Sequence, residues 1–120
     1  MEVKNYAKAT QYLAELLRLV PTDFEAYYLM GQCETEITNY YEAIENYTKS
    51  IELQPKFAAA YTQRGLAKVK LLEKEEKSVN QSNNVDACKD LETGLKLGDK
   101  GAEEWMQQYC FGEPTDADKK

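Results

Sequence analysis

Apolar residues recur at intervals of three and four positions along most of the chain, which is the spacing of one face of an α-helix. Between residues 5 and 20 they fall at Tyr6, Ala9, Leu13, Leu16, Leu17 and Val20. The same spacing predicts further helices over 24–37, 40–53, 57–76, 85–97 and 102–110. We therefore expect an all-α protein with about six helices.

Residues that typically begin and end helices stand between these segments. Asp23 and Asn84 each precede a predicted helix and can cap it, because their side-chain oxygens can accept a hydrogen bond from an unpaired amide. Pro55 closes another helix, since proline has no amide hydrogen and disfavours helix in the residue before it. Gly98 suits a left-handed C-cap.

A period of 34 residues underlies the helix pattern. It is clearest over residues 24–57, at Tyr27, Met30, Gly31, Glu34, Ala43, Tyr47 and Pro55. Adding 34 to Tyr27 and Gly31 gives Tyr61 and Gly65, and subtracting 34 from Pro55 gives Pro21. The segment 5–20 is then the second helix of a pair whose first helix would precede it, which suggests that the natural chain extends upstream.

One polar stretch interrupts the period. The match expected at residue 77 resumes at Ala87, so ten residues are inserted within 73–84, and we expect an exposed loop there. The sequence thus predicts one helical repeat domain over 1–111. It contains a full repeat (24–57), an interrupted repeat (58–101) and a half repeat at each end. Residues 112–120 have no apolar anchor and are expected to be a disordered tail.

The central segment resembles the tetratricopeptide repeat (TPR), whose template is aromatic-x2-apolar-Gly-x2-aromatic, then Ala-x3-aromatic, then Pro. Glu34 departs from it, because it occupies an aromatic position. Residues 87–110 also resemble the closing segment of bacterial members of the family. The resemblance implies a right-handed superhelix of antiparallel helix pairs. It also implies a scaffold that binds a peptide or partner protein in a concave groove, with no catalysis and no cofactor.

Transferring the family's groove positions to this sequence gives three groups of residues. They are Glu25, Tyr28, Leu29, Gln32 and Glu36, then Thr62, Gln63, Leu66 and Lys70, and finally Glu103, Met106 and Gln107. The family's carboxylate clamp for acidic chaperone tails needs cations, whereas its slots here hold Tyr28, Gln32, Gln63, Glu103 and Gln107. We therefore expect an extended segment with apolar anchors, and a basic residue is compatible with this groove.

A second interpretation is a structural segment that associates with itself. In that case the exposed repeat ends would form a homodimer and the groove would stay empty. Two full repeats are fewer than the three that a stable stack usually needs. The sequence does not decide between this interpretation and the scaffold.

Composition excludes several other functions. The net charge of −6 and the pI near 4.8 should repel phosphate backbones, so we expect no nucleic-acid partner. No run approaches the roughly 18 apolar residues that a membrane span requires, so we expect no membrane insertion. With no histidine, a serine or cysteine nucleophile lacks its usual base, and the glycines form no phosphate-binding loop. We predict no enzyme and no metal site.

The three cysteines allow two interpretations. Cys33, Cys88 and Cys110 form no CxxC motif, so each can be a small buried apolar residue. Alternatively, Cys88 and Cys110 lie on adjacent helices and form a disulfide, which needs an oxidising compartment. The localisation is therefore open between the cytoplasm and, with a disulfide, the periplasm or the exterior.

Overall fold

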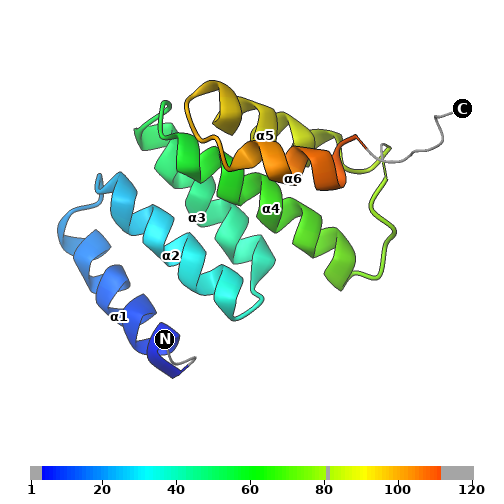
Figure 1. Cartoon of the computed structure of the whole chain (residues 1–120). Coiled ribbons are helices and arrows are strands. Elements are labelled where there is room, and N and C mark those ends of the chain that lie inside the picture. The colour runs from blue at the N-terminus through cyan, green and yellow to red at the C-terminus, as the bar shows by residue number, and fades with distance from the viewer. Residues whose placement is uncertain (1–3, 81, 112–120) are drawn as a thin grey trace, which may run out of the picture.

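The computed structural model describes residues 4–80 and 82–111, which fold as six α-helices (Figure 1). The helices are α1 (Lys4–Leu19), α2 (Phe24–Glu36), α3 (Tyr40–Leu53), α4 (Ala58–Lys74), α5 (Val85–Lys96) and α6 (Ala102–Tyr109). Their bounds lie within two residues of those predicted from the apolar spacing, and the all-α fold is confirmed. The predicted tail, 112–120, lies outside the described residues.

The helix ends show why most of these bounds were predictable. Asp23 caps α2, since its Oδ1 accepts a hydrogen bond from the Ala26 amide at 3.1 Å. Gly98 follows α5 with a φ of 115°, in the left-handed region that favours glycine. The expected cap at Asn84 is wrong. Its side chain makes no capping bond, and its Nδ2 instead donates to the carbonyl of Tyr109 at 2.5 Å, which ties the start of α5 to the end of α6.

The helices form a single stack in chain order, in which each one packs against its sequence neighbours (Figure 1). The first helices of successive pairs also touch, since α2 contacts α4 and α4 contacts α6. Within the described residues, the second helices α1, α3 and α5 do not contact one another. The stack therefore curves toward the side of α2, α4 and α6, which we call the inner face.

Two glycines let neighbouring helices approach closely. A Cβ atom built on Gly31 would lie 2.6 Å from Cε1 of Tyr47, a side chain with no exposed surface. One built on Gly65 would lie 2.8 Å from the carbonyl oxygen of Ala87 and 3.1 Å from Cγ of Leu91. The distances to Tyr47 and to the Ala87 carbonyl are shorter than real Cβ atoms show, and the distance to Leu91 is tighter than most Cβ contacts. These positions therefore explain why the 34-residue pattern carries glycine on α2 and α4.

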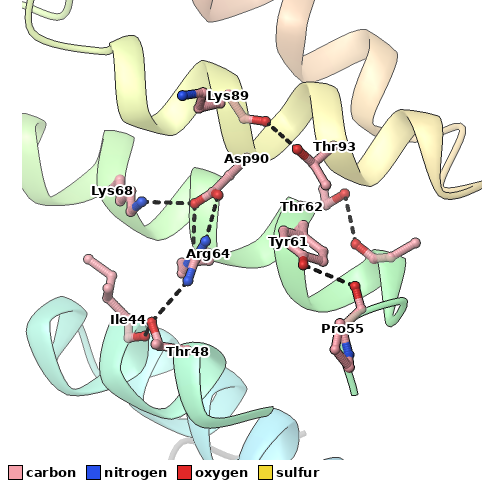
Figure 2. Close-up of polar contacts among 11 residues, drawn as sticks. Ile44, Thr48, Pro55, Tyr61, Thr62, Arg64, Lys68, Lys89, Asp90 and Thr93 are labelled. Carbon is pink, nitrogen blue, oxygen red and sulfur yellow. Dashed lines mark hydrogen bonds and ion pairs between the residues drawn. The ribbon is translucent and has the colours of Figure 1, made fainter. Parts of the chain in front are cut away.

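Buried charge fixes α4 against its two neighbours (Figure 2). Asp90 of α5 is 6% exposed and accepts hydrogen bonds from Nε and Nη2 of Arg64, both at 2.8 Å. Lys68 lies 2.9 Å from the same carboxylate, and Nη1 of Arg64 donates to Thr48 of α3 at 3.1 Å. The bond to Asp90 raises the pKa of the Arg64 guanidinium. Arg64 and Lys68, which stand where the template is apolar or aromatic, thus link three helices.

A disulfide joins Cys88 of α5 to Cys110, the residue that follows α6. Its Sγ atoms are 2.10 Å apart and its Cα atoms 5.8 Å apart. Among the described residues Cys33 is the free cysteine, and it is buried between α1 and α2. The structure thus contains the pairing that one of the two interpretations of the cysteines proposed.

Candidate protein-interaction surface

The five predicted groove residues of α2 differ in exposure. Glu25, Leu29 and Glu36 are exposed, and Leu29 keeps 46% of its surface accessible. Tyr28 is half-buried, because its ring packs against Phe57 at 4.9 Å and against Tyr47 at 5.8 Å between centroids. Its Oη accepts a hydrogen bond from Gln32 at 3.3 Å. Burial raises the pKa of the Tyr28 phenol, and the carboxylate of Asp99 adds to the shift.

Two of the four predicted groove residues on α4 need correction. Thr62 is 2% exposed and Leu66 is 8% exposed, so neither is accessible to a ligand. The reason is that α4 lies in the middle of the stack, in contact with α2, α3, α5 and α6. Thr62 sits so close to Gly94 of α5 that a Cβ there would collide with its Oγ1. Gln63 and Lys70 are half-buried and remain partly accessible.

Several of the predicted residues lie in different clefts of the described structure. On α6, Glu103 and Gln107 are exposed, whereas Met106 is half-buried beside the disulfide in a cleft with Cys88 and Cys110. Lys70 lines a different cleft, with Tyr40 and Lys74. Leu29, Gln32 and Glu36 do come together, at a third cleft between α1 and α2. The predicted groove residues are thus distributed over three clefts and over exposed helix surface.

The cleft between α1 and α2, which we call the end cleft, has a volume of about 450 Å³. It is lined by Tyr6, Ala9, Tyr12, Leu13, Leu29, Gln32, Cys33 and Glu36. Tyr12 is open to solvent at this cleft, with 71% of its surface exposed. No binding role was predicted for the α1 residues, because their spacing also fits simple packing on the next helix. The available signal was the register of residues 5–20, which matches the second helix of a pair in the 34-residue period.

Three of the predicted groove residues are exposed carboxylates, namely Glu25 and Glu36 of α2 and Glu103 of α6. The described residues contain no group of three or more His, Cys, Asp or Glu side chains placed to hold a metal ion. No helix in 4–80 or 82–111 is long and apolar enough to cross a membrane.

Comparison with known families gives a match for the central helix pair, α2 and α3. The model of the tetratricopeptide repeat matches residues 24–57, which are α2, α3, the turn between them and the four residues after α3. Comparison with curated proteins gave no match. Tetratricopeptide repeats typically act as non-catalytic scaffolds for protein–protein interaction. The single helix α1, the pair α4 and α5, and the single helix α6 extend the same stack on either side of the matched pair. The central helix pair of this chain is thus similar to a tetratricopeptide repeat.

Proposed function

We propose that this chain is an interaction module whose inner face holds an extended segment of a partner protein. The observation that carries the proposal is the contact of α2 with α4 and of α4 with α6, which sets three first helices side by side. Predicted groove side chains on all three helices remain accessible, including Glu25, Gln63 and Glu103. A ligand that crosses the three helices would touch each of them.

The exposed side chains indicate the chemistry of the segment. Leu29 and the half-buried ring of Tyr28 offer apolar contacts to alternate side chains of an extended chain. The carboxylates of Glu25 and Glu103, on a protein with a net charge of −6, favour a basic residue and repel an acidic one. We therefore expect a ligand with apolar anchors and at least one lysine or arginine.

A displayed library of random 12-residue peptides, selected on the full chain, tests this proposal. We expect selected peptides to be rich in basic and large apolar residues. The double variant Glu25→Lys/Glu103→Lys should weaken their binding at least about tenfold, because it reverses two charges beneath the ligand. The matched control is Glu42→Lys/Asp86→Lys, which makes the same charge change in the first turns of α3 and α5.

Equal weakening by both double variants would show that only net charge matters and would contradict an inner-face site. Failure to select any peptide that competes for binding would also contradict it. Because all four positions are exposed and lie in first turns, the two variants should lose similar stability.

A second candidate function is self-association through the ends of the stack. It is favoured by three exposed apolar side chains at one end, Tyr12 (71%), Leu19 (64%) and Val20 (44%). Light scattering separates the two functions. A dimer that Tyr12→Glu converts to a monomer would favour self-association, and a monomer at all concentrations would exclude it.

A further inference from the structure

We propose that the end cleft between α1 and α2 is a second binding site, which accepts one amphipathic helix of a partner polypeptide. The helix would lie antiparallel to α1 and parallel to α2. This site shares Leu29 with the contacts proposed for the inner face, but it takes a helix instead of an extended segment. Its test reports on the end cleft through Cys33 and so does not depend on the function proposed above.

The chain itself shows what covers an equivalent surface. Three residues that line the end cleft are Ala9, Leu13 and Cys33. Adding the repeat period of 34 to their numbers gives Ala43 and Tyr47 of α3 and Ala67 of α4. There α2 packs over the surface, and the three side chains are 0%, 0% and 1% exposed. In the end cleft no helix of the described residues takes this place, and Leu29 and Tyr12 stay open to solvent.

The contact between α4 and α5 is an even closer template for the missing helix. In α5 the residues equivalent to Ala9 and Leu13 are Ala87 and Leu91, so the small residue and the leucine recur at the same spacing. Gly65 of α4 packs on both, too close for a side chain of its own. A helix in the end cleft therefore needs glycine, or at most alanine, opposite Leu13.

Charge defines the last turn of the bound helix. A helix parallel to α2 would end beside Glu36, which lines the end cleft at the C-terminus of α2. On the other side of α2, the neighbouring helix α4 presents Lys70 and Lys74 at the corresponding place, and Nζ of Lys74 donates to the carbonyl of Thr38 at 2.8 Å. The partner helix should accordingly carry lysine or arginine in its last turn.

A second copy of this chain is a poorer occupant than a partner polypeptide. Its terminal first helix, α6, would have to enter the cleft. By register α6 has Tyr109 where α4 has Gly65, and its last turn contains no basic residue. It thus lacks both features that the cleft requires.

The test uses the full chain and a synthetic peptide of residues 57–75, FAAAYTQRGLAKVKLLEKE, which contains the helix that covers the equivalent Ala87–Leu91 surface. Cys33 lines the cleft and is free, so its maleimide alkylation reports occupancy at that place. We expect saturating peptide to slow this alkylation about tenfold, and a Gly65→Leu peptide to bind about tenfold more weakly. In the protein, Tyr12→Ala/Leu29→Ala should weaken binding, and the control Tyr41→Ala/Leu53→Ala, at exposed sites outside the cleft, should not.

Each contrary result overturns the proposal. No saturable binding, or binding that leaves Cys33 alkylation unchanged, would show that the cleft is not a helix site. Equal affinity of the two peptides would remove the close-packing argument. A peptide-free dimer that protects Cys33 and that Tyr12→Ala dissociates would assign the cleft to a second copy. Peptide-free protection of Cys33 in a natural chain that extends upstream would assign the cleft to the first helix expected there. None of these results depends on peptide selection at the inner face, because Glu25 and Glu103 do not line the end cleft.

Discussion

At the scale of single residues, buried polar groups determine how α4 is seated. Apolar contact alone lets two helices slide, whereas a carboxylate that must meet two cations has one position. Asp90 is almost fully buried, and its two oxygens are used by Arg64 and Lys68, whose side chains are 18% and 27% exposed. The Arg64 side chain also donates a hydrogen bond to Thr48 of α3, so this one side chain fixes the relative positions of three helices.

The first prediction concerns this carboxylate. Asp90→Asn keeps the size of the side chain but leaves Arg64 and Lys68 without their counter-charge, so the free energy of unfolding should fall by about 3 kcal/mol. Urea unfolding followed by circular dichroism measures the loss. The control is Glu92→Gln on the same helix, whose exposed pair with Lys96 should contribute less than about 0.5 kcal/mol. Similar losses from both changes would contradict a structural role for the buried cluster.

The second prediction concerns the buried phenol of Tyr47. Burial strongly raises its pKa above the ordinary value of 10.0. A raised pKa means that the Tyr47 phenol stays protonated to a higher pH in the folded state than in the unfolded state. Its contribution to the free energy of unfolding is therefore complete below pH 10 and is lost as the pH rises above that value. The free energy of unfolding should decline by about 1.4 kcal/mol per pH unit for this group. Tyr47→Phe should show a shallower alkaline decline, and an identical decline would contradict the argument.

At the scale of helices, spacing is set by glycine on one helix and a large side chain on the next. The sequence predicted this well, because the repeat pattern marks Gly31 and Tyr47 and because local capping at Asp23 fixes where α2 begins. Contacts that depend on tertiary placement were not predictable. The inserted residues separate Arg64 from Asp90, so no local spacing joins them. Thr62 and Leu66 were expected on an open face, but the central position of α4 buries both.

The third prediction tests the close approach of α2 and α3. Gly31→Ala gains about 1 kcal/mol of helix propensity, but its methyl group would overlap the Tyr47 ring. We expect a net destabilisation of about 1 to 3 kcal/mol. In a Tyr47→Leu background, which copies the Gly65–Leu91 contact, the same change should become neutral or stabilising. A double-mutant cycle from urea unfolding measures this coupling, and additive effects would refute it.

At the scale of the whole molecule, stability should vary along the stack, because each helix depends mainly on its neighbours. Among the described residues, helices α2 to α5 each have a neighbour on both sides, whereas α1 packs on α2 alone. The other terminal helix, α6, has additional ties. The disulfide joins its end to α5, the Asn84 side chain binds the Tyr109 carbonyl, and Ala102 at its start is fully buried. The two ends of the stack should therefore behave differently.

The fourth prediction follows from this asymmetry. In native hydrogen exchange, the amides of α1 should exchange at least about tenfold faster than those of α3 and α4, because opening α1 disrupts one interface only. Those of α6 should stay protected until the disulfide is reduced, after which their exchange should rise toward that of α1 while α3 changes little. Reduction removes the constraint on a loop of 22 residues and should destabilise the chain by about 3 kcal/mol.

The variant Cys88→Ser/Cys110→Ser should reproduce the reduced pattern without reductant, which controls for effects of the reagent. Trp105, the single tryptophan, lies on α6 and gives an independent fluorescence signal of its release. One common exchange rate for all six helices, with and without reductant, would mean that the stack opens only as a unit and would contradict nearest-neighbour stability.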